Sequence, residues 1–203
     1  MSRVQCNRFV LDEEGLLGPS PRFVIWFHGC NRNCPGCIAV DWNTKRKPEF
    51  DLSVLTIVQT IEKYPLAEGI TISGGEPFCQ VDALLELASA LYNNGLGIII
   101  YTGYELSELI AMHDDRVDRI LSIVDVLIDG RYISELDDDK PFRGSANQTI
   151  HQFSDRYAAF FSQEKERTAS IEKQAGQELL TGIPDSMTKL EWAKIKETHG
   201  KKC

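Results

Sequence analysis

The sequence predicts an α/β fold built on a parallel sheet. Two patterns carry this prediction: short apolar segments rich in β-branched and aromatic residues, and longer segments whose apolar residues recur at helical spacing. The two kinds of segment alternate at intervals of about 30 residues, as they do in βαβ units. Four clear strands are too few to close an eight-stranded barrel, so we expect an open, partial (β/α) barrel.

The expected strands are short and end at turn residues. The first is the continuous apolar run RFVIWF, which begins at Arg22 and is typical of a buried strand. Gly74 follows the second strand and Gly130 follows the fourth. The expected strands are 22–27, 68–73, 97–102 and 125–129, with 149–153 as a candidate fifth.

The expected helices lie between these strands. In the clearest one, Leu84, Leu87 and Leu91 share a face, and Gly95 lies past its end. The expected helices are 52–64, 81–92, 106–112 and 117–123. Right-handed crossovers place the carboxyl ends of the parallel strands at one edge, where α/β sheets bind their ligands.

The composition changes after about Ser162. Residues 162–203 carry eight basic and seven acidic side chains, a net charge of +1, whereas the whole chain carries −8. Two helices are expected here, over 164–180 and 187–198, separated by Gly182 and Pro184. We therefore expect a core domain at 1–161 and a C-terminal helical extension at 162–203.

The composition also excludes some classes of function. With 30 acidic and 22 basic residues, the chain lacks the excess of Lys and Arg that nucleic-acid binding requires. It has neither an apolar run of about 20 residues nor a signal-peptide core, so we expect a cytoplasmic protein without a membrane partner. Thiols stay reduced in that compartment, so the six cysteines indicate metal ligands or reactive thiols rather than disulfides.

Cys30, Cys34 and Cys37 form the most informative cluster. Three thiolates within eight residues, directly after a strand, can converge on one metal centre, and thiolates favour zinc, copper(I) or iron–sulfur clusters. Structural zinc takes four ligands, whereas three cysteines on a four-iron cluster leave one iron open to a ligand. The alternatives are a zinc site completed by His28, Cys79 or another residue, and a redox pair at Cys34 and Cys37.

A second motif, Ser73-Gly74-Gly75-Glu76-Pro77, follows the second expected strand. Together with the C-x3-C-x2-C spacing of the cysteines, it resembles the radical S-adenosylmethionine (SAM) superfamily. Within that superfamily the chain resembles the anaerobic ribonucleotide reductase activating proteins, a family of glycyl radical enzyme activases. Further matching stretches are GPSPR at 18–22, CPGC at 34–37, YTGYEL at 101–106, VLIDG at 126–130 and RGSANQ at 143–148.

The resemblance implies a barrel of the radical SAM type and the following chemistry. Cys30, Cys34 and Cys37 bind three irons of a [4Fe-4S] cluster, and the fourth iron holds the amino and carboxylate groups of SAM. An external one-electron donor such as flavodoxin reduces the cluster. Cleavage of SAM gives a 5′-deoxyadenosyl radical, which makes a glycyl radical on a partner enzyme, an anaerobic ribonucleoside-triphosphate reductase.

The cofactor contacts expected around the Gly-rich motif follow from residue chemistry. Gly74 and Gly75, after Ser73, let the backbone approach a ligand closely, and Pro77 fixes the backbone after the turn. Glu76 can accept hydrogen bonds from the cationic amine of SAM. By resemblance, Gly36 and the backbone of Cys37 and Ile38 face the adenine.

Thr102 and Asp129 end the third and fourth strands at the same edge. They are candidates to bind ribose, a carboxylate or a water, with turn and cap chemistry as the alternative. The run Asp137–Asp139 is interpreted as a solvated loop, because consecutive carboxylates do not converge on one ion. Cys6, Cys79 and Cys203 show no ligand spacing.

Two other functions remain open from the sequence. One is a radical SAM enzyme that modifies a peptide or protein with the same cluster. The other, of a different class, is a zinc-stabilised interaction module without catalysis.

Overall fold

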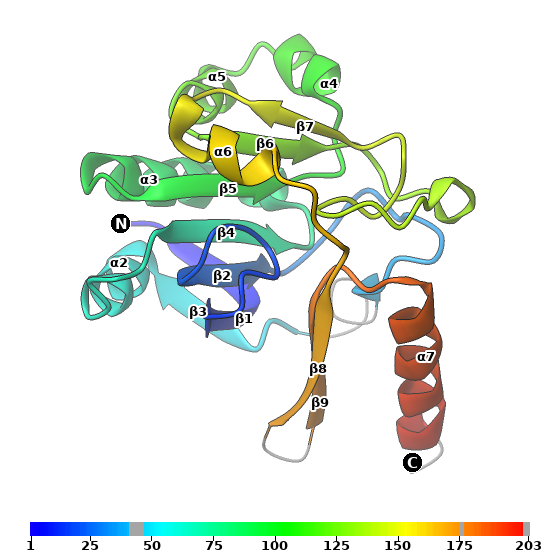
Figure 1. Cartoon of the computed structure of the whole chain (residues 1–203). Helices are drawn as coiled ribbons and strands as arrows, with labels where there is room; N and C mark the ends of the chain where they lie inside the picture. The colour runs from blue at the N-terminus through cyan, green and yellow to red at the C-terminus, as the bar shows by residue number, and fades with distance from the viewer. Residues whose placement is uncertain (41–46, 175–176, 201–203) are drawn as a thin grey trace.

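The computed structural model describes residues 1–40, 47–174 and 177–200. A seven-stranded mixed sheet runs through the molecule in the order β3-β1-β2-β4-β5-β6-β7 (Figure 1). Its strands are β1 (Arg3–Asp12), β2 (Arg22–Phe27), β3 (Phe50–Ser53), β4 (Gly69–Gly74), β5 (Gly97–Tyr101), β6 (Val126–Asp129) and β7 (Thr149–Gln152). The central pairs β2–β4, β4–β5 and β5–β6 are parallel, which confirms the α/β prediction.

The outer strands are antiparallel to their neighbours. β1 pairs with β2 and with β3, and β7 pairs with β6. The sequence analysis did not predict β1, although its Val4 and Cys6 are fully buried. It also placed the end of β3, Leu52 and Ser53, in a helix, and the candidate fifth strand is β7.

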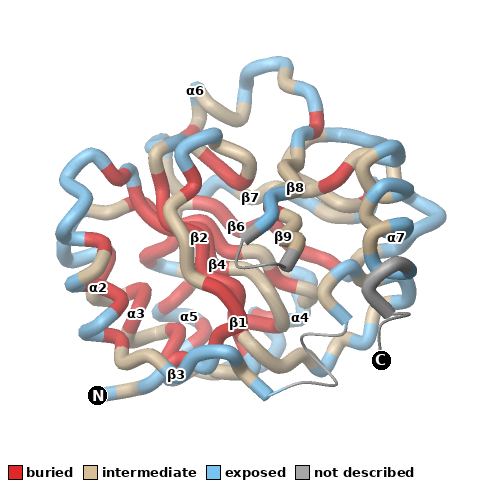
Figure 2. Tube along the Cα trace, turned by 90° about the horizontal axis from the view of Figure 1, so that it is seen from below, coloured by how far each residue is buried: buried red, intermediate tan, exposed pale blue. Residues whose placement is uncertain are grey.

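The helices within residues 54–121 cover one face of the sheet, towards which alternate side chains of the strands point. Phe23, Ile25 and Phe27 of β2 belong to the main core, which the helices complete, whereas Val24 and Trp26 face the other side. The α-helices are α2 (Val54–Glu62), α3 (Val81–Asn93), α4 (Leu106–Ala111), α5 (Asp115–Leu121), α6 (Ala158–Phe161) and α7 (Ser186–Gly200). Short 3-10 turns are η1 (Pro77–Gln80), η2 (Ser134–Leu136) and η3 (Asp155–Tyr157). Figure 2 shows the buried residues concentrated in the central strands and the helices beside them.

The expected helix at 164–180 is wrong. Residues in this range form a two-stranded antiparallel sheet, β8 (Ala169–Gln174) with β9 (Gln177–Gly182). A contact with the core accounts for the difference: the Arg8 guanidinium of β1 donates to the Thr181 hydroxyl at 2.8 Å and to the Leu180 carbonyl at 3.4 Å. The expected helix at 187–198 is confirmed as α7.

The C-terminal extension, defined here as residues 162–200, is therefore a hairpin followed by a helix. Its Ile183 packs against Leu17, Val24 and Trp26, on the sheet face opposite to the main core. None of the helices in the described ranges is long and apolar enough to cross a membrane.

Candidate active site

A cavity of about 500 Å³ lies where the parallel strands end, a volume within the range typical of small-molecule sites. The loop after β2, the turn after β4 and the residues after β5 and β6 all contribute to its walls. Most of the residues expected at the site line it: Cys30, Cys34, Gly36, Cys37, Ile38, Ser73, Gly74, Gly75, Glu76 and Thr102. Pro77 and Asp129 are not among the lining residues.

The three clustered cysteines are partly exposed free thiols in this cavity. Positive φ angles at Asn33 (49°) and Gly36 (75°) curve the loop that carries them. The backbone N–H of Arg32 donates to the Cys30 sulfur at 3.4 Å. Burial raises the pKa of the Cys30 and Cys37 thiols, and a bound metal would favour their thiolate forms instead.

Three thiols on one loop suit a four-iron cluster, which takes one cysteine per iron and leaves the fourth iron open. His28, a candidate fourth zinc ligand, instead lies 2.9 Å from the Asn7 amide oxygen through its Nδ1. Cys79 is exposed and does not line the cavity.

The Gly-rich turn is fixed against the end of β2. A Cβ atom on Gly74, whose φ is +105°, would lie 2.5 Å from the backbone nitrogen of Phe27, so only glycine fits there. The N–H of Gly75 donates to the Phe27 carbonyl, and the N–H of Glu76 to the Gly29 carbonyl, both at 2.8 Å. The turn and the start of the cysteine loop are thereby held side by side.

Glu76 is fully buried and connects this turn to the end of β5. Its carboxylate accepts hydrogen bonds from the Phe78 N–H (3.1 Å), the Thr102 hydroxyl (2.9 Å) and the Gly103 N–H (2.8 Å). Burial raises the pKa of Glu76 to about 7, against the opposing effect of these hydrogen bonds. The side chain thus orders two loops of the cavity and still lines its wall.

Thr102 and Asp129, which were predicted to act at the same edge of the sheet, have different partners, and only Thr102 lines the cavity. Thr102 lines the cavity with its hydroxyl committed to Glu76. The Asp129 carboxylate accepts from the N–H groups of Leu106 (2.7 Å) and Thr149 (3.2 Å), and lies 2.9 Å from the His151 ring nitrogen. Asp129 therefore joins β6 to α4 and β7.

Arg32, between the cluster cysteines, is a cavity residue that the sequence analysis missed. Its guanidinium donates to the Gly103 carbonyl at 3.0 Å, binds both carboxylate oxygens of Glu108 and lies 4.1 Å from the centre of the Tyr104 ring. The position of Arg32 inside the cysteine motif was the available signal. These contacts anchor the cysteine loop to the end of β5.

A second missed group comes from the C-terminal extension. The same cavity is also lined by residues far from the cysteine loop in sequence: Ile183, Pro184, Lys189, Trp192 and Lys196. No motif in residues 162–200 signals a site, so only the folded structure reveals this wall.

The sequence is similar to those of known iron–sulfur proteins. A family model described as "4Fe-4S single cluster domain" matches residues 16–151, a range that includes both motifs. The chain is 31% identical over 145 residues to the anaerobic ribonucleoside-triphosphate reductase-activating protein of Vibrio cholerae, covering 68% of this chain and 91% of that protein. For the protein of the same name from Haemophilus influenzae the identity is 33% over 144 residues, with coverages of 67% and 90%.

More distant matches are also found. The pyruvate formate-lyase-activating enzyme of Staphylococcus epidermidis is 29% identical over 145 residues, covering 68% of this chain and 57% of that enzyme. Among solved structures, QueE from Escherichia coli aligns with 50% of this chain and 52% of that chain, at 20% identity and a TM-score of 0.38.

The family model matches more than half of the chain, and the Vibrio cholerae relative is matched over nearly its whole length. The predicted iron–sulfur enzyme of the radical SAM type is thereby confirmed, and the chain belongs to the family of anaerobic ribonucleoside-triphosphate reductase-activating proteins.

Proposed function

We propose that this protein generates a glycyl radical on a partner enzyme, an anaerobic ribonucleoside-triphosphate reductase, by reductive cleavage of SAM. The observation that carries the proposal is that Cys30, Cys34, Cys37 and the Gly-rich turn ending at Glu76 line one cavity. The names of the relatives supply the identity of the partner.

The chain's own residues would hold the cofactors as follows. Cys30, Cys34 and Cys37 would bind three irons, leaving one iron open towards the cavity. The backbone of 73–76 would hold the amino group of SAM, with the Glu76 carboxylate beside it. Because three protein donors already occupy that carboxylate, its first task is to keep the turn in place.

When bound, the reduced cluster would supply the electron that splits SAM into methionine and a 5′-deoxyadenosyl radical. That radical would take a hydrogen atom from a glycine Cα of the partner, giving 5′-deoxyadenosine and a glycyl radical. The electron comes from an external one-electron donor of the flavodoxin type. The protein positions the reacting groups.

We also propose the finer features of the fold that accompany this function. The sheet and its helices form a partial, open barrel of the radical SAM type, with the core domain at 1–161 and residues 162–203 added to it. A reducing cytoplasm suits the free thiols.

The test is anaerobic reconstitution with iron and sulfide, followed by SAM and dithionite. We expect about four irons per chain and 5′-deoxyadenosine in the wild type, and neither full iron loading nor 5′-deoxyadenosine in Cys34→Ala. Cys79→Ala is the matched control, because Cys79 is exposed and outside the cavity. Zinc binding without SAM cleavage would overturn the proposal.

A second assay addresses the partner. The loaded enzyme is mixed with the reductase from the same organism, and a glycyl radical is sought by electron paramagnetic resonance. Cleavage of SAM without a radical on the reductase would instead favour a peptide- or protein-modifying enzyme.

A further inference from the structure

We infer that Trp192 of α7 is the contact for the purine ring of SAM, so that the C-terminal extension forms a wall of the cofactor site. This inference rests on the proposed function and extends it to a residue outside the range 16–151 that the family model matches. Three features of the extension support it: the place of α7, the chemistry of Trp192, and the contacts that fix the extension to the core.

The helix α7 lies against the cysteine loop. The Lys196 ammonium donates to the Ile38 carbonyl at 3.3 Å, directly after the last cluster cysteine. Trp192 is four residues earlier and therefore on the same helix face, and its ring centre lies 5.9 Å from the Lys196 Nζ. Trp192 and Lys196 both line the cavity, together with Gly36 and Ile38.

The Trp192 side chain suits a flat heteroaromatic ligand. Its indole Nε1–H is buried and has no hydrogen-bond acceptor among the residues that the structure describes. A buried donor without an acceptor is unfavourable, and indole N–H groups usually find a partner when buried. A purine offers in-plane acceptor nitrogens to an indole N–H that meets it edge-on, and a face to an indole that lies parallel to it, whereas the methionine part of SAM offers no such ring.

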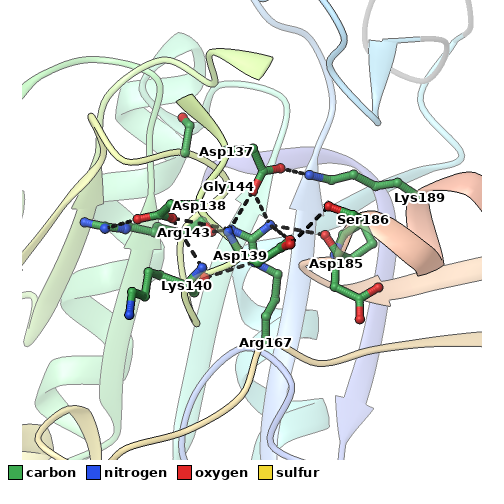
Figure 3. Close-up of polar contacts among 12 residues, drawn as sticks. Asp137, Asp138, Asp139, Lys140, Arg143, Gly144, Arg167, Asp185, Ser186 and Lys189 are labelled. Atoms are coloured by element: carbon green, nitrogen blue, oxygen red, sulfur yellow. Dashed lines mark hydrogen bonds and ion pairs between the residues drawn. The ribbon is translucent and has the colours of Figure 1, made fainter. Parts of the chain in front are cut away.

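Arg167 fixes the extension to the loop that follows β6 (Figure 3). Its side chain is only 1% exposed, and its guanidinium donates to the carboxylate of Asp137 at 2.8 Å. It also donates to the carbonyls of Lys140 at 2.9 Å and Arg143 at 2.6 Å, and within the extension to that of Pro184 at 3.3 Å.

The first turn of α7 is held by the same loop. The Ser186 hydroxyl donates to the Asp139 carboxylate at 3.0 Å, and the Lys189 ammonium pairs with Asp137 (Figure 3). Figure 1 shows the result, with α7 standing apart from the helices that cover the sheet. The helix that carries Trp192 is thus positioned at the cavity by directional polar contacts.

The role of Lys196 follows from this arrangement. Its ammonium holds α7 to the cysteine loop through the Ile38 carbonyl, so it is a positioning residue for Trp192. We expect Lys196→Met to have a smaller effect on SAM binding than removal of the indole.

The experiment measures binding rather than turnover. Equilibrium dialysis gives the Kd of SAM, of S-adenosylhomocysteine and of methionine for the reconstituted wild type, Trp192→Ala, Trp192→Phe and Leu190→Ala. Leu190 is the matched control, because it lies on α7, is 59% exposed and does not line the cavity.

The expected result separates the two halves of SAM. In Trp192→Ala the Kd of SAM and of S-adenosylhomocysteine rises roughly tenfold or more, the loss expected for a base–aromatic stack, while the Kd of methionine is unchanged. Trp192→Phe, which keeps a ring and loses the N–H, falls between wild type and Trp192→Ala. Leu190→Ala binds all three ligands as the wild type does.

Other results overturn the inference. Unchanged SAM affinity in Trp192→Ala, or an equal loss for methionine and SAM, would show that Trp192 does not contact the purine. Trp192→Phe gives the answer if the alanine variant fails to fold, since it keeps an aromatic ring at this position. A reconstituted wild type that neither binds nor cleaves SAM would instead defeat the proposed function.

Discussion

The sheet core and the C-terminal extension are held in place by different forces. All six residues of β2 are buried, and the core around them is apolar. In the extension, Met187 and Leu190 of α7 are 75% and 59% exposed, and a buried anchor is the charged Arg167. Apolar burial is non-directional and spread over many residues, whereas the anchoring of α7 depends on a few directed contacts. A single substitution should therefore release the extension and leave the core folded.

The largest expected effect is in the core. Leu87 of α3 is fully buried in the main core, so Leu87→Ala should lower the free energy of unfolding by about 2–5 kcal/mol. Urea denaturation of the cluster-free protein measures it. Leu55→Ala, at a position 45% exposed on α2, should change the midpoint little. A loss below about 1 kcal/mol for Leu87→Ala would show that the core relaxes to fill the space left by the removed side chain.

Arg167→Met should produce a local effect instead. Removing one partner of a buried ion pair costs about 3–5 kcal/mol, and here the extension can avoid that cost by detaching. We expect faster proteolysis within residues 162–200 and little change in the urea midpoint of the core. Arg116→Met, which removes an exposed pair with Asp114, is the control. If core and extension unfolded together in Arg167→Met, the two regions would form one cooperative unit.

A smaller effect concerns the buried charge of the core. Glu76 has a pKa of about 7 in the folded protein against 4.5 as its ordinary value, so between these values the folded state binds more protons than the unfolded state. The free energy of unfolding should then fall as pH rises from about 4.5 to about 7, by at most about 3 kcal/mol. Arg32 faces Glu76, and its positive charge opposes this shift. Cys30 and Cys79 also face Glu76, but they are uncharged thiols over this pH range.

Urea titrations of the cluster-free wild type and Glu76→Gln at pH 5, 6 and 7 test this. The amide cannot ionise, so the difference between the two proteins should itself change with pH. A constant difference would place the Glu76 pKa near its ordinary value.

The smallest expected effect is at the surface. Arg3 and Asp51 form an ion pair at 2.9 Å with side chains 58% and 52% exposed. Solvent screens such pairs, so Arg3→Ala should change the unfolding free energy by less than about 0.5 kcal/mol. Thermal unfolding in low and high salt checks this value. A larger, salt-sensitive loss would mean that edge strand β3 depends on this pair.

Local patterns account for what the sequence could predict. The run 22–27, the spacing of the cysteines and the turn at 73–77 each carry their signal within a few residues, and the cysteines and most of that turn meet at one cavity. The strand β1 was missed because its pairing partners lie elsewhere in the chain. The hairpin β8–β9 was missed because its contact with the core joins Arg8 to Leu180 and Thr181, more than 170 positions later in the sequence.

The loop predicted at Asp137–Asp139 is confirmed, with Asp138 and Asp139 exposed, but the partner of its carboxylates was not predicted. Consecutive carboxylates do not converge on a metal ion, but Asp137 and Asp139 both lie within 3.5 Å of the Arg167 guanidinium. The partner is 28 to 30 residues away in sequence, and no local pattern identifies it. Of the cysteines without ligand spacing, Cys6 is buried, Cys79 is exposed and Cys203 lies outside the described residues.

The burial of Cys6 in β1 has a consequence for metal loading. Desolvation raises the pKa of this thiol to about 12, so it stays protonated at neutral pH. Iron and alkylating reagents react with thiolates, and Cys6 offers them almost none. Iron delivered to the folded chain therefore meets the three partly exposed thiols of the cavity and not the one in the core, because burial keeps Cys6 both inaccessible and protonated.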